Sequence, residues 1–392
     1  MKCVSALSTA RSASTAFHQI LERLDAAPDA AEDAPPADLT LIFSSRHHAP
    51  VLGKLSQAFL ESGRTRHVLG CTGESIVGDD QEVERRPALA VWSLHHPGME
   101  IQPVRFDPGG GPLRRALESL EKPDDSVMIL LADPFTFAVH DLLKLANEEH
   151  RGLRIVGGMA SGGSEPGANR LLLDGEAFTD GAVAVRLSGP VSIRSVVSQG
   201  CRPVGRTLLV TKAEHNIIRE LGRRPALEVL REVLGDLPDD DVEKVREGLH
   251  LGRVINEYQE SFHRGDFLVH NVVGADETGA IQISDLIRVG QTVQFHVRDA
   301  ETADEDLREA LARRPDGEAA ASTPVGALLF SCNGRGTRLF PTPNHDVGVI
   351  HEVLGPIPVA GFFAMGELGP IGGQNFIHGF TASVAVFERP SG

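Results

Sequence analysis

The sequence contains little cysteine. Only four cysteines occur among 392 residues, and no two of them stand close enough to form a CxxC pair. So few cysteines cannot build a disulfide framework in a chain of this length, which favours a reducing compartment. No apolar run reaches the ~18 residues that a membrane-spanning helix needs. We therefore expect a cytoplasmic protein that has no membrane partner.

Positive charge is also scarce. The chain has 38 basic residues against 54 acidic ones, giving a formal net charge of −16, and no block of basic residues occurs. A large negative balance favours solubility and opposes binding to nucleic acid or to an anionic membrane. The charge therefore predicts that nucleic acid is not a partner.

Common catalytic and metal-binding motifs are missing as well, since the sequence has neither a P-loop nor an HExxH motif. Sixteen histidines occur, but His47-His48 and His95-His96 are adjacent pairs. Neighbouring side chains on an extended chain point to opposite faces, which suits chelation poorly. We expect no resident metal and no catalytic activity.

An internal repeat is the strongest sign of organisation. Three segments each contain an apolar strand, a crossover, a second apolar strand with a central glycine, and a third apolar strand. The first strands are predicted at residues 41–45, 129–133 and 328–332, the second at 68–71, 155–158 and 359–362, and the third at 89–92, 182–185 and 384–387.

Strands that are apolar on both sides belong in a sheet covered on both faces. A crossover of this length predicts that the first two strands of each repeat are parallel. We expect the central glycines to shape turns or to admit a ligand at the strand ends. Glycines that only shape turns are an equally weighted alternative.

Between the second and third repeats the pattern changes to a β-rich segment. Strands are predicted at 191–197, 208–210, 267–273 and 292–297, with a helix at 225–234. The sequence thus predicts a two-part α/β architecture with pseudo-repeats and mixed, largely covered sheets. We place an N-terminal domain at 1–190 and a C-terminal domain at 191–392, with a linker near 313–324.

Several phrases together resemble the FIST family of bacterial sensory proteins. They are SALST at 5–9, LGCTG at 69–73, IVGG at 155–158, GCRPVG at 200–205, VTKAE at 210–214, VGQTVQFHVRD at 289–299, LFSCNGRG at 329–336, VAGFF at 359–363 and GELGP at 366–370. The resemblance covers nearly the whole chain.

The resemblance implies an intracellular sensory domain for signal transduction that binds a small ligand such as an amino acid. Some members of the family bind haem and respond to nitric oxide. We expect no attached kinase, cyclase or receptor segment, and we therefore expect the output to pass through a separate signalling protein or through oligomerisation.

A candidate ligand site follows the first strand of the third repeat. Asn333 and Gly336 allow a nest of backbone N–H groups that suits an anion, and Arg335 can hold a carboxylate in a bidentate pair. Glu367, in a glycine-flanked loop, can accept from an ammonium group. We predict that these groups bind an amino acid or another small carboxylate in one pocket. A structural salt bridge between Arg335 and Glu367 is an equal alternative.

Further candidate ligand-binding residues stand at or near the glycine-containing strands. They are Cys71, Gly158, Gly361, Phe362 and Cys332. Cys332 also defines an alternative function, a cysteine-dependent enzyme, which requires a base nearby; His345, His351 and His378 are the candidates nearest in sequence. A buried, inert thiol is favoured over a nucleophile.

A haem-binding nitric-oxide sensor is the other alternative. Haem needs an axial ligand and an apolar slot, and His296 and His378 are the candidate ligands. A core or surface histidine is the favoured interpretation of each, and Gly379-Phe380 after His378 leaves its role open.

Overall fold

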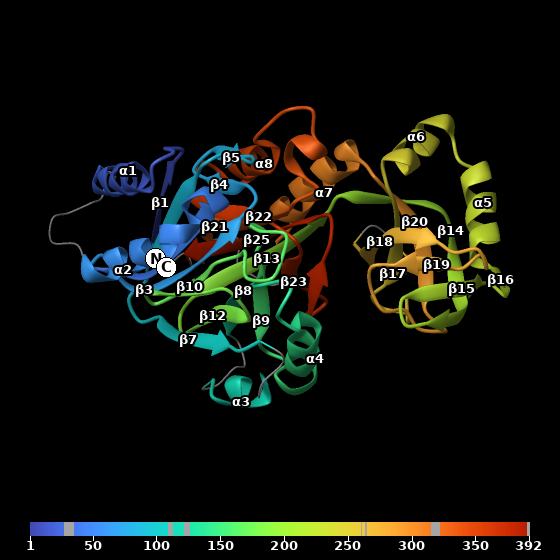
Figure 1. Ribbon diagram of the computed structural model, residues 1–392, viewed down its shortest axis with the longest axis horizontal. Helices are drawn as coiled ribbons and strands as arrows, with labels where there is room; N and C mark the ends of the chain where they lie inside the picture. The colour runs from blue at the N-terminus through green and yellow to red at the C-terminus, as the bar shows by residue number, and fades with distance from the viewer. Residues whose placement is uncertain are drawn as a thin grey trace. The chain divides into compact units, whose positions relative to one another are not determined.

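The computed structural model describes residues 1–26, 35–108, 113–120, 126–259, 261–262, 265–314 and 322–389. Most of the predicted linker at 313–324 lies outside these ranges. The chain divides into two compact units (Figure 1). Unit 1 comprises Met1–Val197, Leu307–Ile377 and Thr381–Gly392, and unit 2 comprises Ser198–Asp306 and His378–Phe380. The third repeat thus packs with the first two, rather than with the β-rich segment that precedes it.

Unit 1 contains three six-stranded mixed sheets that share one strand order. Sheet 1 is β1 (Lys2–Ser8), β6 (Leu89–His95), β2 (Ala37–Ser45), β3 (Thr65–Gly73), β10 (Leu171–Leu173) and β11 (Glu176–Phe178). Sheet 2 is β7 (Glu100–Phe106), β12 (Ala182–Ser188), β8 (Val127–Ala132), β9 (Arg154–Met159), β23 (Glu367–Ile371) and β24 (Gln374–His378). Sheet 3 is β13 (Ser192–Gln199), β25 (Thr381–Arg389), β21 (Thr323–Cys332), β22 (Val359–Ala364), β4 (Ile76–Gly78) and β5 (Gln81–Val83).

The predicted repeat is confirmed by the strand pairing. The first and second strands of each repeat are parallel neighbours: β2 with β3, β8 with β9, and β21 with β22. The third strand pairs antiparallel with the first, as β6, β12 and β25. The chain therefore has the mixed α/β fold that the sequence predicts.

The three repeats also exchange hairpins. The β4–β5 hairpin follows β3 of the first repeat but completes sheet 3, and the β10–β11 hairpin follows β9 of the second repeat but completes sheet 1. The β23–β24 hairpin of the third repeat completes sheet 2 in the same way. Each sheet is thus finished by a different repeat, which closes the three repeats into a ring.

The inner faces of the three sheets meet in one core. Equivalent residues of the first strands point into it: Leu41, Phe43, Ile129, Leu131, Leu328 and Phe330. The residues between them point outward, and Ile42, Leu130 and Leu329 each join a separate cluster under the helices. Successive side chains of a strand point to opposite faces. Because both faces are buried here, consecutive residues of these strands are apolar.

Helices cover the outer faces of the sheets. α1 (Ala13–Asp25) and α2 (Leu52–Glu61) pack on sheet 1, α4 (Val139–Glu149) packs on sheet 2, and α8 (His345–Leu354) packs on sheet 3. Unit 1 also contains η1 (Arg46–Val51), α3 (Leu113–Glu118) and η2 (Gly336–Arg338), and α7 (Ala300–Ala312) contains residues of both units. No helix among the described residues is long and apolar enough to cross a membrane.

Unit 2 is a curled antiparallel sheet. Its order is β14 (Cys201–Glu214), β20 (Thr292–Arg298), β17 (Leu249–Val254), β18 (Phe267–Ala275), β19 (Ile281–Ile283), β15 (Ile217–Leu221) and β16 (Arg224–Pro225). β14 also pairs with β15, so the sheet closes on itself around an apolar core. α5 (Ala226–Gly235) packs on that core, and α6 (Asp239–Glu247) follows it.

The central glycines of the repeats do not form turns at the strand ends, as the sequence suggested, but lie inside the second strands. Gly70, Gly157 and Gly361 pair with Ile42, Leu130 and Leu329. A Cβ atom at these glycines would lie 2.2, 2.0 and 1.8 Å from the carbonyl oxygen of the paired residue. The glycines therefore permit a close approach of the two parallel strands.

Replacing Gly361 by alanine should prevent unit 1 from folding, because the added methyl group would overlap the backbone of β21. The matched control is Gly348→Ala in α8, where a Cβ meets nothing within 4 Å. Alanine there should stabilise the helix by roughly 0.8–1.0 kcal/mol. Urea denaturation followed by circular dichroism measures both effects. A folded Gly361→Ala protein with an unchanged melting curve would contradict this account.

Candidate functional site

The candidate site lies in unit 1, at the carboxyl ends of β21 and β22 in the third repeat. Cys332 ends β21, and the chain then turns sharply, with the Arg335 N–H donating to the Cys332 carbonyl at 2.8 Å. The Asn333 N–H donates to the Ala364 carbonyl at the end of β22. These bonds hold residues 333–338 across the ends of both strands.

Arg335 is fully buried and pairs with Asp346 in the first turn of α8. Its Nε donates to Asp346 Oδ2 at 2.8 Å, and its Nη2 donates to Oδ1 at 2.7 Å. Ser331 and His345 also contact the Asp346 carboxylate, at 2.8 and 3.0 Å. Burial alone would raise the pKa of Asp346, but the charge and hydrogen bonds of Arg335 outweigh it and lower that pKa.

Glu367 begins β23 and is also fully buried. Its Oε2 accepts hydrogen bonds from the backbone N–H and the hydroxyl of Thr381, at 3.2 and 2.8 Å. Burial raises the pKa of Glu367 to about 8, against opposing effects of Thr381, the neighbouring Cys332 side chain and the Arg335 charge. Glu367 is therefore mostly protonated at neutral pH and can donate a hydrogen bond.

A second protonated carboxyl lies near the same ion pair. Burial, and then repulsion by Asp346, raises the pKa of Glu82 in β5 to about 8. Its Oε1 accepts from the Val347 N–H at the start of α8, at 3.0 Å. Burial is thus the main reason that both glutamates hold protons at neutral pH, and repulsion by Asp346 adds to it for Glu82.

Four buried polar atoms of this cluster have no hydrogen-bond partner among the described residues. They are Asn333 Oδ1, Arg335 Nη1, Glu367 Oε1 and Glu82 Oε2. A buried polar atom without a partner costs roughly 1–3 kcal/mol, so such atoms are rare and usually mark a site for water, an ion or a ligand. Donors and acceptors are both present, which suits a small polar molecule.

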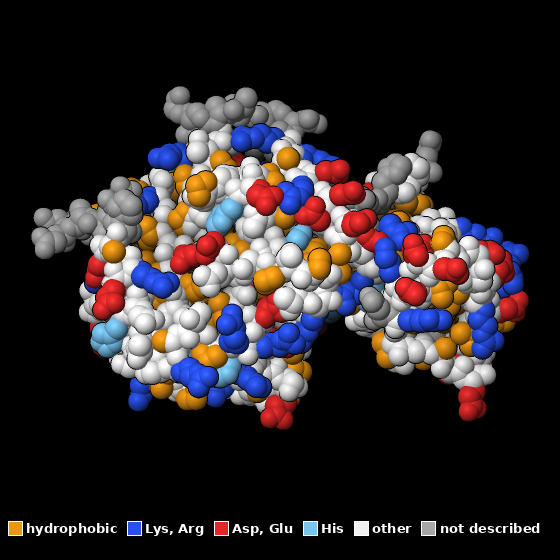
Figure 2. All heavy atoms as spheres, turned by 90° about the horizontal axis from the view of Figure 1, so that it is seen from above, with side chains coloured by type: hydrophobic (Ala, Val, Ile, Leu, Met, Phe, Trp, Pro, Cys, Tyr) orange, Lys and Arg blue, Asp and Glu red, His pale blue; other side chains and the backbone are white. Residues whose placement is uncertain are grey.

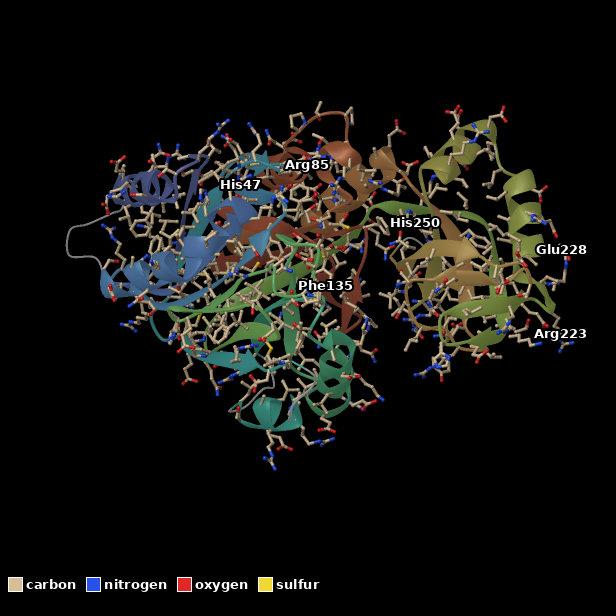
Figure 3. All side chains as sticks on the ribbon, viewed as in Figure 1. His47, Arg85, Phe135, Arg223, Glu228 and His250 are labelled. Atoms are coloured by element: carbon tan, nitrogen blue, oxygen red, sulfur yellow. The ribbon has the colours of Figure 1, made fainter. Side chains whose placement is uncertain are left out.

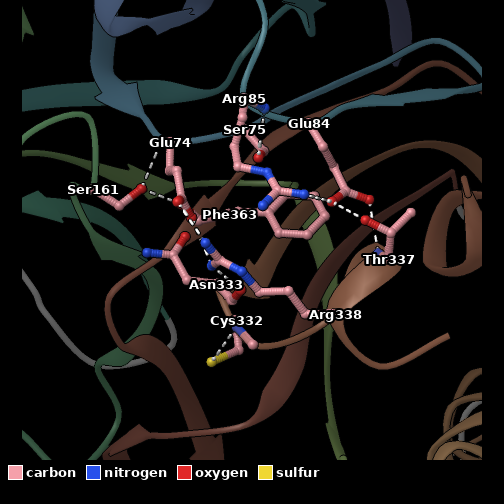
Figure 4. A network of polar contacts seen from close by, with 11 residues as sticks. Glu74, Ser75, Glu84, Arg85, Ser161, Cys332, Asn333, Thr337, Arg338 and Phe363 are labelled. Atoms are coloured by element: carbon pink, nitrogen blue, oxygen red, sulfur yellow. Dashed lines mark hydrogen bonds and ion pairs between the residues drawn. The ribbon is translucent and has the colours of Figure 1, made fainter.

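Two glutamates of the first repeat anchor the loop that carries these groups (Figure 4). Arg338 forms a bidentate ion pair with Glu74 at 2.8 and 2.9 Å and also donates to the Asn333 carbonyl. The Thr337 N–H donates to Glu84 at 2.8 Å. The loop therefore depends on the hairpin exchange, because β4 and β5 bring these glutamates to the third repeat.

The other two repeats show which side chains are special to the third. β3, β9 and β22 are the second strands of their repeats, and each pairs with an exchanged hairpin. In the sheet of β9 the hairpin places Glu367 at the position that Leu171 and Ile76 occupy beside β3 and β22. A buried carboxyl thus replaces an apolar residue at one of three equivalent positions. Departures of this kind from a local rule are expected at functional sites.

The remaining predicted ligand residues are placed as follows. Cys71, Gly361 and Phe362 are buried inside strands β3 and β22, and burial raises the pKa of the Cys71 thiol. Phe362 packs against Phe43, with ring centroids 5.5 Å apart. Gly158 lies in β9 directly opposite Glu367. Gly336 packs so closely against Glu84 that a Cβ would lie 2.7 Å from its Oε1.

Arg335 and Glu367 come into one neighbourhood, but they do not form the salt bridge that was the structural alternative. Asp346 takes that role, and sequence reasoning missed it together with Glu82. The signal for Asp346 was weak: an acidic residue in the first turn of a short helix is ordinary. Glu82 lies about 250 residues before Arg335 in the chain, so no local pattern connects them.

The histidines considered as haem ligands lie in unit 2, where His250 is labelled in Figure 3. His296 is buried in β20, 5.0 Å from the Phe267 ring, and burial lowers its pKa to about 4. Its partner across the strands is His250, whose pKa is also lowered to about 4, chiefly by burial. His378 is buried at the end of β24. No group of three metal-binding side chains gathers in the part of the chain that the structure describes.

A separate cavity of about 410 Å³ opens near the amino end of β22, away from the candidate site. Its lining contains none of the clustered buried carboxyls described above; it is formed by Lys2, Cys3, Val4, Ser5, Asp79, Asp80, His351, Pro356, Ile357 and Pro358. The face drawn in Figure 2 carries acidic and basic side chains interspersed. Neither this cavity nor this face contains the unpartnered buried donors and acceptors that lie at the strand ends of the third repeat.

The fold and the buried polar cluster define a mixed α/β protein built from three repeats, with a cluster of buried polar groups at the strand ends of the third. Two models of known protein domains match this chain. The FIST N domain matches residues 38–224 and the FIST C domain matches residues 226–370. The chain therefore belongs to the FIST family.

Two curated relatives match over most of their length. A protein of Mycobacterium tuberculosis (strain ATCC 25618 / H37Rv) is 42% identical over 353 residues, covering 89% of this chain and 91% of the relative. A protein of Mycobacterium bovis (strain ATCC BAA-935 / AF2122/97) is 41% identical over 364 residues, covering 91% and 92%. Both are named as uncharacterized proteins.

The two glutamates should make the protein less stable as the pH rises. Each has a folded-state pKa of about 8, above the unfolded value near 4.3. Their stabilising contribution is therefore complete below about pH 4.3 and is lost as the pH rises through 8, at roughly 1.4 kcal/mol per pH unit for each carboxyl. Glu367→Gln should reduce this slope in urea denaturation between pH 5 and 8, whereas exposed Glu148→Gln should leave it unchanged. Equal slopes for the two variants would contradict the assignment.

Removing Arg335 should be costly. Arg335→Met leaves the buried Asp346 carboxylate without its guanidinium, so we expect a loss of about 3–5 kcal/mol in the free energy of unfolding. Arg338→Ala removes a half-exposed ion pair with Glu74 and should cost only about 0–1 kcal/mol. Denaturation of the two variants side by side measures the difference. Similar losses in both would show that burial does not set the energetics of the Arg335 pair.

Proposed function

We propose that this protein is an intracellular sensory protein that binds a small polar acid, such as an amino acid or another small carboxylate, at the strand ends of the third repeat. The observation that carries the proposal is the group of buried polar atoms without partners around Arg335 and Glu367. Membership of the FIST family supports a role in binding small ligands.

The unpartnered atoms match the groups of such a ligand. The Arg335 Nη1 can donate to a carboxylate oxygen, and protonated Glu367 can donate to a second oxygen of the ligand through Oε1. The Asn333 Oδ1 can accept from an ammonium group. Each bond satisfies an atom that is already desolvated, so binding regains interaction energy without a new desolvation cost on the protein side.

We propose that a ligand reaches these atoms from the side of the loop at residues 333–338. Cys332 and Asn333 are partly exposed, while Arg335 and Glu367 are buried beneath them. The Arg338–Glu74 ion pair holds this loop at its exposed edge. In our proposal a ligand that binds beneath the loop changes how firmly it is held, and a separate signalling protein in the cytoplasm detects the change.

A thermal-shift screen against amino acids and small carboxylates tests the proposal. A ligand at 100 times its Kd should stabilise the protein by about 2.7 kcal/mol. Asn333→Ala should weaken the binding of an amino acid more than that of the same acid without its amino group. If no small acid shifts the melting curve of the wild-type protein, the proposal is wrong.

Binding of a carboxylate should also weaken as the pH rises through about 8. Glu367 then loses its proton, so a donor becomes a negative charge beside the acidic ligand. Calorimetric titrations between pH 6.5 and 9 measure this, and Glu367→Gln, which keeps a donor without the charge, should remove most of the pH dependence. An affinity that rises over this range would assign Glu367 another role.

A further inference from the structure

Cys332 differs from the other three cysteines in its surroundings. Cys3, Cys71 and Cys201 are buried, and burial raises the thiol pKa of Cys3 and of Cys71. Buried thiols of this kind are inert, since the thiolate is the reactive form. Cys332 is partly exposed, at the point where β21 reaches the candidate site.

Groups that support thiol chemistry surround Cys332. The Gly334 N–H donates to the Cys332 sulfur at 3.5 Å. The Cys332 side chain lies close enough to the Glu367 carboxyl to influence the pKa of Glu367. Glu367 Oε1 makes no hydrogen bond of normal geometry among the described residues. Arg335 and Arg338 both lie within electrostatic range of the thiol. A thiol thus adjoins a carboxylic acid and two cations.

Equivalent positions in the other repeats carry no such group. The strand register aligns Cys332 with Ser45 and with Asp133. The Ser45 hydroxyl accepts from the Ala88 N–H, and the Asp133 carboxylate accepts from Asn169 and Thr136. The Ser45 hydroxyl also contacts His47 Nδ1 at 3.2 Å. The third repeat alone places a thiol at the end of its first strand.

We infer that Cys332 is a nucleophile that captures a small 2-oxo acid by a reversible covalent bond. The inference rests on the proposed function, because the same site must first bind the carboxylate of the ligand. The ligand's carboxylate contacts Arg335 Nη1, and its carbonyl carbon lies against Cys332 Sγ. Glu367 then faces the carbonyl oxygen.

The step balances without an oxidant, a reductant or a leaving group. The Cys332 sulfur bonds to the carbonyl carbon as the carbon–oxygen π bond breaks, and Glu367 gives its proton to the oxygen. The thiol proton passes to Glu367, which is restored as the acid. The product is a thiohemiketal with a hydroxyl group, and the reverse path releases the ligand unchanged, as a sensor requires.

Glu367 holds the proton that this step needs. Burial raises the pKa of Glu367 to about 8, so the carboxyl is mostly protonated at neutral pH and can give its proton to the carbonyl oxygen. The Cys332 side chain lies close enough to influence that pKa, so the proton donor and the thiol are neighbours.

A comparison of pyruvate with lactate tests the inference, because lactate keeps the carboxylate but has no electrophilic carbon. In calorimetric titrations we expect wild-type protein to bind pyruvate at least about tenfold more tightly than lactate. The Cys332→Ala variant should bind the two equally. With 2-¹³C-pyruvate, wild-type protein should also move the carbon resonance from the ketone region to that of a tetrahedral carbon.

Chemical labelling of the wild-type protein gives an independent measurement. Iodoacetate carries a carboxylate and iodoacetamide does not, so Cys332 should react faster with iodoacetate, and pyruvate should protect it. Peptide mass spectrometry reports the site, with buried Cys201 as the internal control. Labelling needs no variant, so it still applies if Cys332→Ala fails to fold.

The outcomes separate the two proposals. Equal binding of pyruvate and lactate by the wild-type protein overturns covalent capture and leaves the carboxylate site standing. A preference for pyruvate that survives in Cys332→Ala also overturns it. Binding of neither acid overturns covalent capture, and the proposed carboxylate site falls with it only if every other small acid in the thermal-shift screen also fails to bind.

Discussion

The close approach of two parallel strands in each repeat is the constraint on which unit 1 depends. Gly70, Gly157 and Gly361 allow it, because any larger residue would overlap the carbonyl oxygen of the neighbouring strand. Close pairing aligns the first strands so that alternate residues reach the shared core and the others reach the helices. The same alignment brings the strand ends of the third repeat together with the exchanged hairpins, and so positions the polar cluster.

Within that cluster, one ion pair balances the buried charge and burial keeps the other carboxyls neutral. Asp346 accepts both hydrogen bonds of the Arg335 pair, which leaves Nη1 as the unpartnered donor of the guanidinium. Glu82 and Glu367 lie in the same buried region, and burial keeps both protonated at neutral pH. The charge of Arg335 is balanced by Asp346 while its Nη1 stays free to donate, so the cluster retains capacity for an anion without repelling it.

Sequence reasoning predicted the periodic parts of this structure. Parallel pairing of residues 41–45 with 68–71 and the helix at 225–234 follow from apolar periodicity, which is a strong local signal. The exchanged hairpins did not follow, because strands of three residues such as β4 and β10 carry too little pattern to choose a partner. The site was predicted only where its residues follow the ends of β21 or β22 in sequence, as Arg335 and Glu367 do. Glu82 and Asp346 join it through pairing that no local motif encodes.

The exchange of hairpins has a consequence for how the chain is made. β9 lacks one neighbour until β23, more than 200 residues later, has left the ribosome. Until then an apolar strand edge stays open, and open edges pair readily with other chains. Sheet 1 draws all its strands from the first two repeats, but sheet 2 stays incomplete during synthesis until β23 and β24 are made. Unit 1 therefore forms as a whole only when the last repeat arrives. Loss of the third repeat would therefore remove the solubility of the rest as well as the site.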